Sequence, residues 1–209
     1  MINRRSFLAA VSLLAAPTLL SKPAAADRSC GPVGCTAQVP FSLFEAHYET
    51  QYQSEWCWAA CISMVFGCYG HPVSQQRIVS EAYGAPYNIP AGSGFMIANA
   101  LNRAWTDDNG RNFSSSLQAA FDAQAGVNAI NSAIIVNALE NGHPLIVGAR
   151  GHAMVLTEAM YVPTPRGPSI VSVGVFDPWP GRGARNLMPD EMIPVPSGSL
   201  AFIALTNVS

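Results

Sequence analysis

The chain has 209 residues, of which 49% are hydrophobic and only 11% are charged, and its formal net charge is −2. A chain of this length can bury one sizeable core, so we expect one folded domain. The low charge and the lack of a basic cluster exclude a typical nucleic-acid-binding protein. Beyond residue 26 there is no apolar run of about eighteen residues, so we expect no stable membrane insertion of that part.

The first 26 residues have the pattern of an export signal. Arg4 and Arg5 precede Ser-Phe-Leu at residues 6–8, an apolar stretch follows to about Leu20, and residues 24–26 are alanines that suit a signal peptidase. The arginine pair resembles the twin-arginine export motif, and an ordinary secretory signal is the alternative. We therefore expect residues 1–26 to be removed and the protein to be exported to the periplasm or the extracellular space. Loss of Arg4, Arg5 and Lys22 leaves 8 basic against 13 acidic side chains, a net charge of −5 without any lysine.

The order of the expected elements indicates an α+β protein. Residues 27–37, rich in Gly, Pro and Cys, are expected to form a Cys-containing loop ahead of a domain at residues 38–209, and Pro40 limits residues 38–43 to an edge strand. The helices are expected at residues 57–66, 75–83, 95–104, 116–123 and 131–140. The strands are expected at residues 144–149, 153–162, 169–176 and 200–206. This order predicts an N-terminal helical subdomain, a C-terminal antiparallel β subdomain and a cleft between them.

The segment QYQSEWCWAA, residues 51–60, carries the most chemical information. It places Cys57 between two tryptophans at the expected start of an apolar helix. A helix N-terminus has unsatisfied N–H groups and a partial positive charge, which favour the thiolate form of a cysteine there. Gln51 lies six residues earlier and has a side-chain N–H suited to a developing oxyanion. The segment therefore predicts a nucleophilic cysteine, and a buried structural cysteine is the alternative.

A nucleophilic cysteine needs a base, and His152 is the histidine best placed to serve as one. It opens an apolar strand directly after Gly151, and a strand end holds a side chain rigidly. A hairpin that turns near Pro165 pairs residues equidistant from the turn, which puts Asp177 beside His152 to within one residue. A carboxylate there would fix the tautomer of the imidazole and stabilise its protonated form.

Three segments together resemble the papain-like cysteine peptidases. Gln51, Cys57, Trp58 and Ala59 match the glutamine and the Cys-Trp-Ala of that family, although its more usual Cys-Gly-Ser-Cys-Trp is absent. The WCWAA form resembles the compact bacterial branch, the staphopain-like and plant-effector-like papain folds. GHAMVLTEA, residues 151–159, resembles its histidine block. VFDPWPGRG, residues 175–183, resembles its third block with Asp in place of Asn, and the resemblance implies that Trp179 shields the polar pair.

The resemblance implies an exported cysteine endopeptidase that hydrolyses peptide bonds without a metal or organic cofactor. Cys57 would be the nucleophile, His152 the base and acid, Asp177 its orienter, and Gln51 an oxyanion donor. The expected partner is a polypeptide substrate. Residues 27–37 are too short for an inhibitory pro-domain, so a separate protein inhibitor or a disulfide-locked thiol is expected to restrain the enzyme.

The five cysteines form an odd set, which in an exported protein indicates one free thiol. With Cys57 as that thiol, we expect the disulfides Cys30–Cys35 and Cys61–Cys68, with cross-pairing of the two pairs as the alternative. Three other functions fit parts of the pattern: an acyltransferase or deamidase with the same triad, a catalytically silent peptide-binding module, and a disulfide-rich surface protein without a site.

Overall fold

The computed structural model describes residues 27–209, and the export signal expected at residues 1–26 lies outside the described residues. The helices are α1 (Phe41–Glu45), α2 (Cys57–Cys68), α3 (Gln75–Tyr83), α4 (Gly94–Ala100) and α5 (Ser132–Glu140), with a 3-10 helix η1 (Pro189–Met192). The strands are β1 (Asp27–Gly31), β2 (Gly34–Gln38), β3 (Arg103–Thr106), β4 (Asn112–Asp122), β5 (Val127–Asn128), β6 (Leu145–Ala149), β7 (His152–Thr164), β8 (Gly167–Asp177), β9 (Gly183–Asn186) and β10 (Leu200–Val208). None of the helices in residues 27–209 is long and apolar enough to span a membrane.

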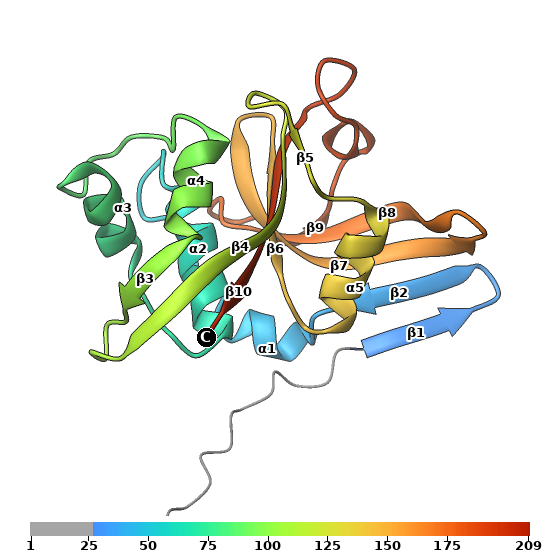
Figure 1. Cartoon of the computed structure of the whole chain (residues 1–209), viewed down its shortest axis with the longest axis horizontal. Helices are drawn as coiled ribbons and strands as arrows, with labels where there is room; N and C mark the ends of the chain where they lie inside the picture. The colour runs from blue at the N-terminus through green and yellow to red at the C-terminus, as the bar shows by residue number, and fades with distance from the viewer. Residues whose placement is uncertain (1–26) are drawn as a thin grey trace, which may run out of the picture.

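The strands of the described chain form one antiparallel sheet, which confirms the α+β class. Its main path runs β1-β2-β7-β6-β10-β4-β3, while β8 pairs with β7 and β9, and β5 pairs with β4. Figure 1 shows α2, α3 and α4 gathered on the side of the sheet where β3 and β4 lie, and α5 near β2 and β7. The helices therefore come mainly from the first half of the chain and the long strands from the second.

Helix α2 is the centre of the core because its sequence is apolar nearly all round. Nine of its twelve residues are buried. Phe66 is fully buried and lies edge-on to Trp105 and Phe113, with ring centroids 5.5 and 5.1 Å apart. The main neighbours of α2 as a whole are β7 and α3. Each buried side chain of this size stabilises the fold by roughly 2 kcal/mol, so the position of α2 relative to the sheet is strongly determined.

Several local expectations differ from the structure. Residues 27–37 form most of the β1–β2 hairpin instead of a loop, with Cys30 paired opposite Cys35. Residues 38–43 are not an edge strand, because β2 ends at Gln38 and α1 begins directly after Pro40, whose ring suits the start of a helix. The expected helix at residues 95–104 ends at Ala100, and residues 103–106 form β3.

The expected helix at residues 116–123 belongs to strand β4. Its short apolar stretch fits either element when taken alone. Pairing decides the outcome, because β10 pairs with residues 115–122 and β5 also pairs with Phe121 and Asp122. Strand β4 alternates buried and exposed residues along much of its length. The segment therefore gains inter-strand hydrogen bonds, whereas a short isolated helix would be only marginally stable.

Candidate active site

Cys57 occupies the first position of α2, and its side chain is half-buried. The helix is preceded by Trp56, no side chain caps its N-terminus, and the first helical hydrogen bond runs from the Ala60 N–H to the Trp56 carbonyl at 2.9 Å. The N–H groups of Cys57, Trp58 and Ala59 belong to the first turn, which has no partners within the helix. The positive end of the helix dipole therefore lies at the Cys57 thiol.

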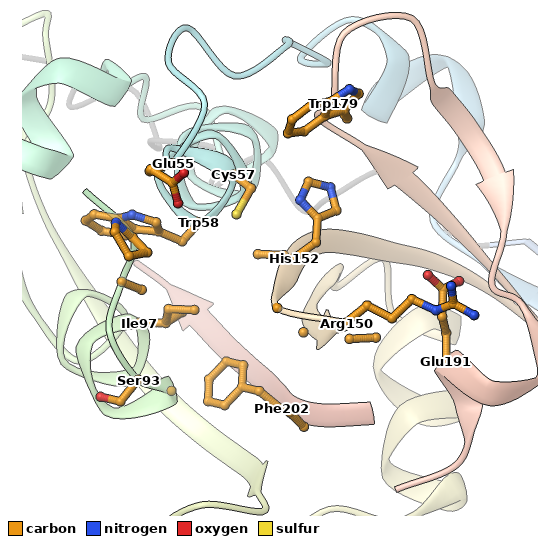
Figure 2. Close-up of a pocket in the computed structure, with 18 of the residues that line it drawn as sticks. Glu55, Cys57, Trp58, Ser93, Ile97, Arg150, His152, Trp179, Glu191 and Phe202 are labelled. Atoms are coloured by element: carbon orange, nitrogen blue, oxygen red, sulfur yellow. The ribbon is translucent and has the colours of Figure 1, made fainter. Parts of the chain in front are cut away.

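His152 and Asp177 meet where β7 begins and β8 ends. His152 Nε2 lies 2.7 Å from Asp177 Oδ1. A two-residue turn with positive φ at Arg150 (53°) and Gly151 (72°) joins β6 to β7 directly ahead of His152, a geometry that matches the twist of a hairpin. Because Nε2 is bound to Asp177, Nδ1 is the ring nitrogen left for the sulfur. Figure 2 shows Cys57 at the start of α2 and His152 at the start of β7 lining the same cleft, and a side-chain hydrogen bond with Cys57 helps to raise the pKa of His152.

The charge state of this pair follows from its contacts. Burial by itself would lower the pKa of His152, but hydrogen bonds with Asp177 and Cys57 outweigh it and raise the pKa to about 9. Burial by itself would raise the pKa of Asp177, but hydrogen bonds from His152, the Trp179 N–H and Arg185 hold it well below its usual range. The arrangement therefore keeps an imidazolium and a carboxylate side by side at neutral pH.

Arg185 and Glu191 extend this cluster, and sequence reasoning missed both. Arg185 Nε donates to Asp177 Oδ2 at 2.9 Å, and its two terminal nitrogens donate to the carboxylate of Glu191 at 2.8 and 3.0 Å. Both carboxylates are buried. The sequence offered one indication of Arg185, its position shortly after the Asp177 segment. Nothing in the sequence near Glu191 indicated that it would bind Arg185 in the folded chain.

Gln51 is buried ahead of α2, but its amide is engaged within its own loop. Its Nε2 donates to the carbonyls of Gln53 and Ser54 at 2.9 and 2.7 Å, and its backbone N–H donates to the Pro178 carbonyl at 2.9 Å. Its Oε1 is buried without a hydrogen-bond partner among the described residues. Gln51 thus ties the loop before Cys57 to the segment after Asp177, and its oxyanion role stays a prediction.

A cleft of about 1170 Å³ opens beside Cys57 and His152. The tryptophan that follows Asp177 lies at its edge: the Trp179 ring is 44% exposed and edge-on to the His152 ring, with centroids 6.1 Å apart. Figure 2 shows Trp58, Ile97 and Phe202 on the apolar side and Glu55, Arg150 and Glu191 as charged members of the wall. Its volume exceeds that of a typical small-molecule pocket, so the cleft has room for a segment of a larger substrate.

The disulfide expectation is half correct. Cys30 and Cys35 form a disulfide across the β1–β2 hairpin. The expected Cys61–Cys68 disulfide is wrong, because both residues are free cysteines on α2. Seven helical positions separate them by about 10 Å along the axis, which is too far for a disulfide. Cross-pairing is also excluded, since Cys30 and Cys35 bind one another.

Thiol counting tests this arrangement. Burial raises the pKa of Cys61 well above its usual value and that of Cys68 to about 12, so neither thiol should react in the native protein near neutral pH. Iodoacetamide should label Cys57 alone before unfolding, three cysteines in denaturant without reductant, and five after reduction. Mass spectrometry of the intact protein gives these counts, and a single labelled cysteine in denaturant would contradict the helix geometry.

Comparison with known proteins adds the family. Residues 44–186 match the model of the Peptidase_C39 like family, so the chain belongs to that family, and this membership supports a cysteine peptidase, a hydrolase. Among solved structures, the crystal structure of UfSP from C. elegans has a TM-score of 0.45 and 14% sequence identity to this chain. The likeness covers 88% of this chain, which spans only 37% of the UfSP chain. No curated protein matches the sequence.

Proposed function

We propose that the chain is a papain-like cysteine endopeptidase in which Cys57, His152 and Asp177 act as a triad on a polypeptide substrate. The observation that carries the proposal is the 2.7 Å hydrogen bond between His152 and Asp177, set beside a cysteine at the uncapped start of α2. The ion pair between His152 and Asp177 is not explained by fold stability, because the cost of removing two charges from water offsets most of their attraction. A perturbed pair in a cleft is more typical of catalysis.

The reaction follows from the positions of the protons. With Nε2–H directed at Asp177, Nδ1 takes the proton of the Cys57 thiol and leaves a thiolate–imidazolium pair. The thiolate attacks the peptide carbonyl carbon, and Nδ1–H then protonates the leaving amine, which departs from the acyl-enzyme. Water next gives its proton to Nδ1 as it attacks the thioester, and the acid product leaves with Cys57 restored.

The oxyanion of each tetrahedral intermediate needs donors. The Cys57 N–H, at the positive end of α2, is the first. We propose the Gln51 amide as the second, which requires it to release one of the two carbonyls it now binds.

The Cys30–Cys35 disulfide supports export to an oxidising compartment, as the N-terminal arginine motif predicts. Assignment to the compact bacterial branch and restraint by a separate protein inhibitor remain proposals from the sequence resemblance.

The test is digestion of an unfolded protein substrate. We expect the mature protein to release peptides whose new ends are free carboxylates and amines, and the Cys57→Ala variant to release none. Mass spectrometry of the products separates hydrolysis from acyl transfer or deamidation, which would alter side-chain masses without cutting the chain. Modified side chains with an intact backbone would overturn the peptidase assignment, and no change at all would favour a peptide-binding module.

A further inference from the structure

Hydrogen-bond donors surround both oxygens of the Asp177 carboxylate. Oδ1 accepts from His152 at 2.7 Å and from the Trp179 N–H at 2.9 Å. Oδ2 accepts from Arg185 Nε at 2.9 Å and lies 3.5 Å from a terminal nitrogen of Arg182. The residue is fully buried. Among the described residues, each oxygen of this side chain therefore faces two donors.

Arg185 is itself held firmly. Its terminal nitrogens bind both oxygens of Glu191, which is 4% exposed and also accepts the Met188 N–H at 2.8 Å. A guanidinium bound in this two-pronged way is fixed in both position and orientation. Its third donor, Nε, consequently points at Asp177 Oδ2 from a fixed direction.

We propose that Arg185, clamped by Glu191, is a positioning residue that requires a carboxylate at position 177 and turns Asp177 Oδ1 toward His152. The inference rests on the proposed triad and concerns how its third member is held. By binding one oxygen, Arg185 prevents rotation of the carboxylate and leaves the other oxygen as the acceptor for His152 Nε2–H. The ring then keeps Nδ1 free to take the proton of Cys57.

An asparagine at position 177 shows why Arg185 decides the residue type. Its side chain has one acceptor oxygen and one donor group. The cation of Arg185 would hold that oxygen, because charge-assisted hydrogen bonds are the stronger ones. The amide NH₂ would then donate to His152 Nε2 and move the proton of the neutral ring to Nδ1, where it faces Cys57. A ring in that tautomer has no lone pair to accept the thiol proton.

The experiment combines three variants with two readouts. The variants are Asp177→Asn, the double variant Arg185→Met with Glu191→Gln, and the triple variant that combines them. The double variant removes both buried charges together, so it leaves no unpaired ion. The readouts are the rate of iodoacetamide labelling at Cys57 at pH 7 and the ¹⁵N NMR shifts of His152, which show which ring nitrogen carries the proton.

Asp177→Asn is expected to slow labelling about a hundredfold, because it creates the wrong tautomer. The double variant is expected to slow it about tenfold, because Asp177 loses its anchor. The triple variant should label about tenfold faster than Asp177→Asn, because without Arg185 the amide oxygen turns to His152. The proton of the neutral ring should lie on Nδ1 in Asp177→Asn and on Nε2 in the triple variant. Arg77→Met, which removes a partly exposed arginine that does not line the cleft, should label like the wild type.

A triple variant as slow as Asp177→Asn, with the proton still on Nδ1, would overturn the proposal. If the triple variant does not fold, the single Asp177→Asn variant decides, because a proton found on Nε2 there contradicts the control exerted by Arg185. If wild-type Cys57 labels no faster than Cys57 in His152→Ala, the proposed peptidase mechanism fails instead. The NMR tautomers still decide the role of Arg185 in that case.

Discussion

Replacing His152 by alanine is expected to lower kcat/KM for peptide hydrolysis by about three orders of magnitude or more, because in the proposed mechanism the variant loses both the base that ionises Cys57 and the acid that protonates the leaving amine. The loss should appear in kcat, since the imidazole acts in the chemical steps and not in substrate binding. His47→Ala is the matched control, because His47 lies outside the cleft lining. Steady-state kinetics with a peptide substrate measures both variants, and equal losses would refute a specific role for His152.

The pH dependence of the wild-type enzyme gives a second readout of the same residue. The pKa of His152 is raised to about 9, so the imidazolium persists through neutral pH and is lost as pH rises through that value. Hydrolysis should therefore fall above about pH 9, because the proposed mechanism needs a protonated His152 to assist the leaving amine. An unperturbed histidine would lose its proton near pH 6.5, so an alkaline limb close to that value would contradict the pairing with Asp177.

Replacing Phe66 by alanine is expected to destabilise the protein by about 3–5 kcal/mol, because it removes a large ring from the centre of the core. Phe66 is fully buried on α2 and packs edge-on against Trp105 and Phe113. Removal of its ring would therefore leave a cavity beside these two rings. For a chain of this size the change corresponds to a fall in Tm of about 10 °C. Urea unfolding followed by circular dichroism measures the free energy of unfolding.

Phe95→Ala is the matched control for that experiment. Phe95 is on α4 and is 64% exposed, so the same chemical change should alter the free energy of unfolding by less than about 1 kcal/mol. Similar losses in the two variants would mean that the packing of α2 does not dominate stability. A large loss for Phe66 alone would tie the orientation of the Cys57 helix to the hydrophobic core.

Strong local patterns in the sequence predicted the framework of this protein well. The apolar run after Cys57 predicted α2, and Gly84, at φ +81°, ends α3 where the sequence indicated. The hairpin itself was predictable from its short turn at residues 165–166, although two register shifts interrupt the regular pairing of β7 with β8. The ladder between the two strands ends at Val155 and Phe176, and the side chains of His152 and Asp177, which the expected hairpin placed beside one another, meet just beyond it.

Local patterns failed where a segment takes its structure from a distant partner. The sequence of residues 116–123 predicted a helix, but pairing with β10, and with β5 at residues 121–122, makes residues 116–122 part of a strand. Cys61 and Cys68 suggested a disulfide by their number, but their shared helix separates them. In both cases the deciding contact or distance depends on backbone conformation, which residue types specify only weakly.

Residue patterns were enough to predict the α+β class, the cysteine at the start of a helix and the pairing of the strand that begins at His152 with the strand that ends at Asp177. These features depend on hydrophobic periodicity and turn geometry, which are encoded by neighbouring residues. The folded chain was needed to reveal that Gln51 binds its own loop, and that Arg185 and Glu191 complete the buried cluster at Asp177. Buried charges must find partners when water is removed, and which charges meet is set by how the strands and loops pack.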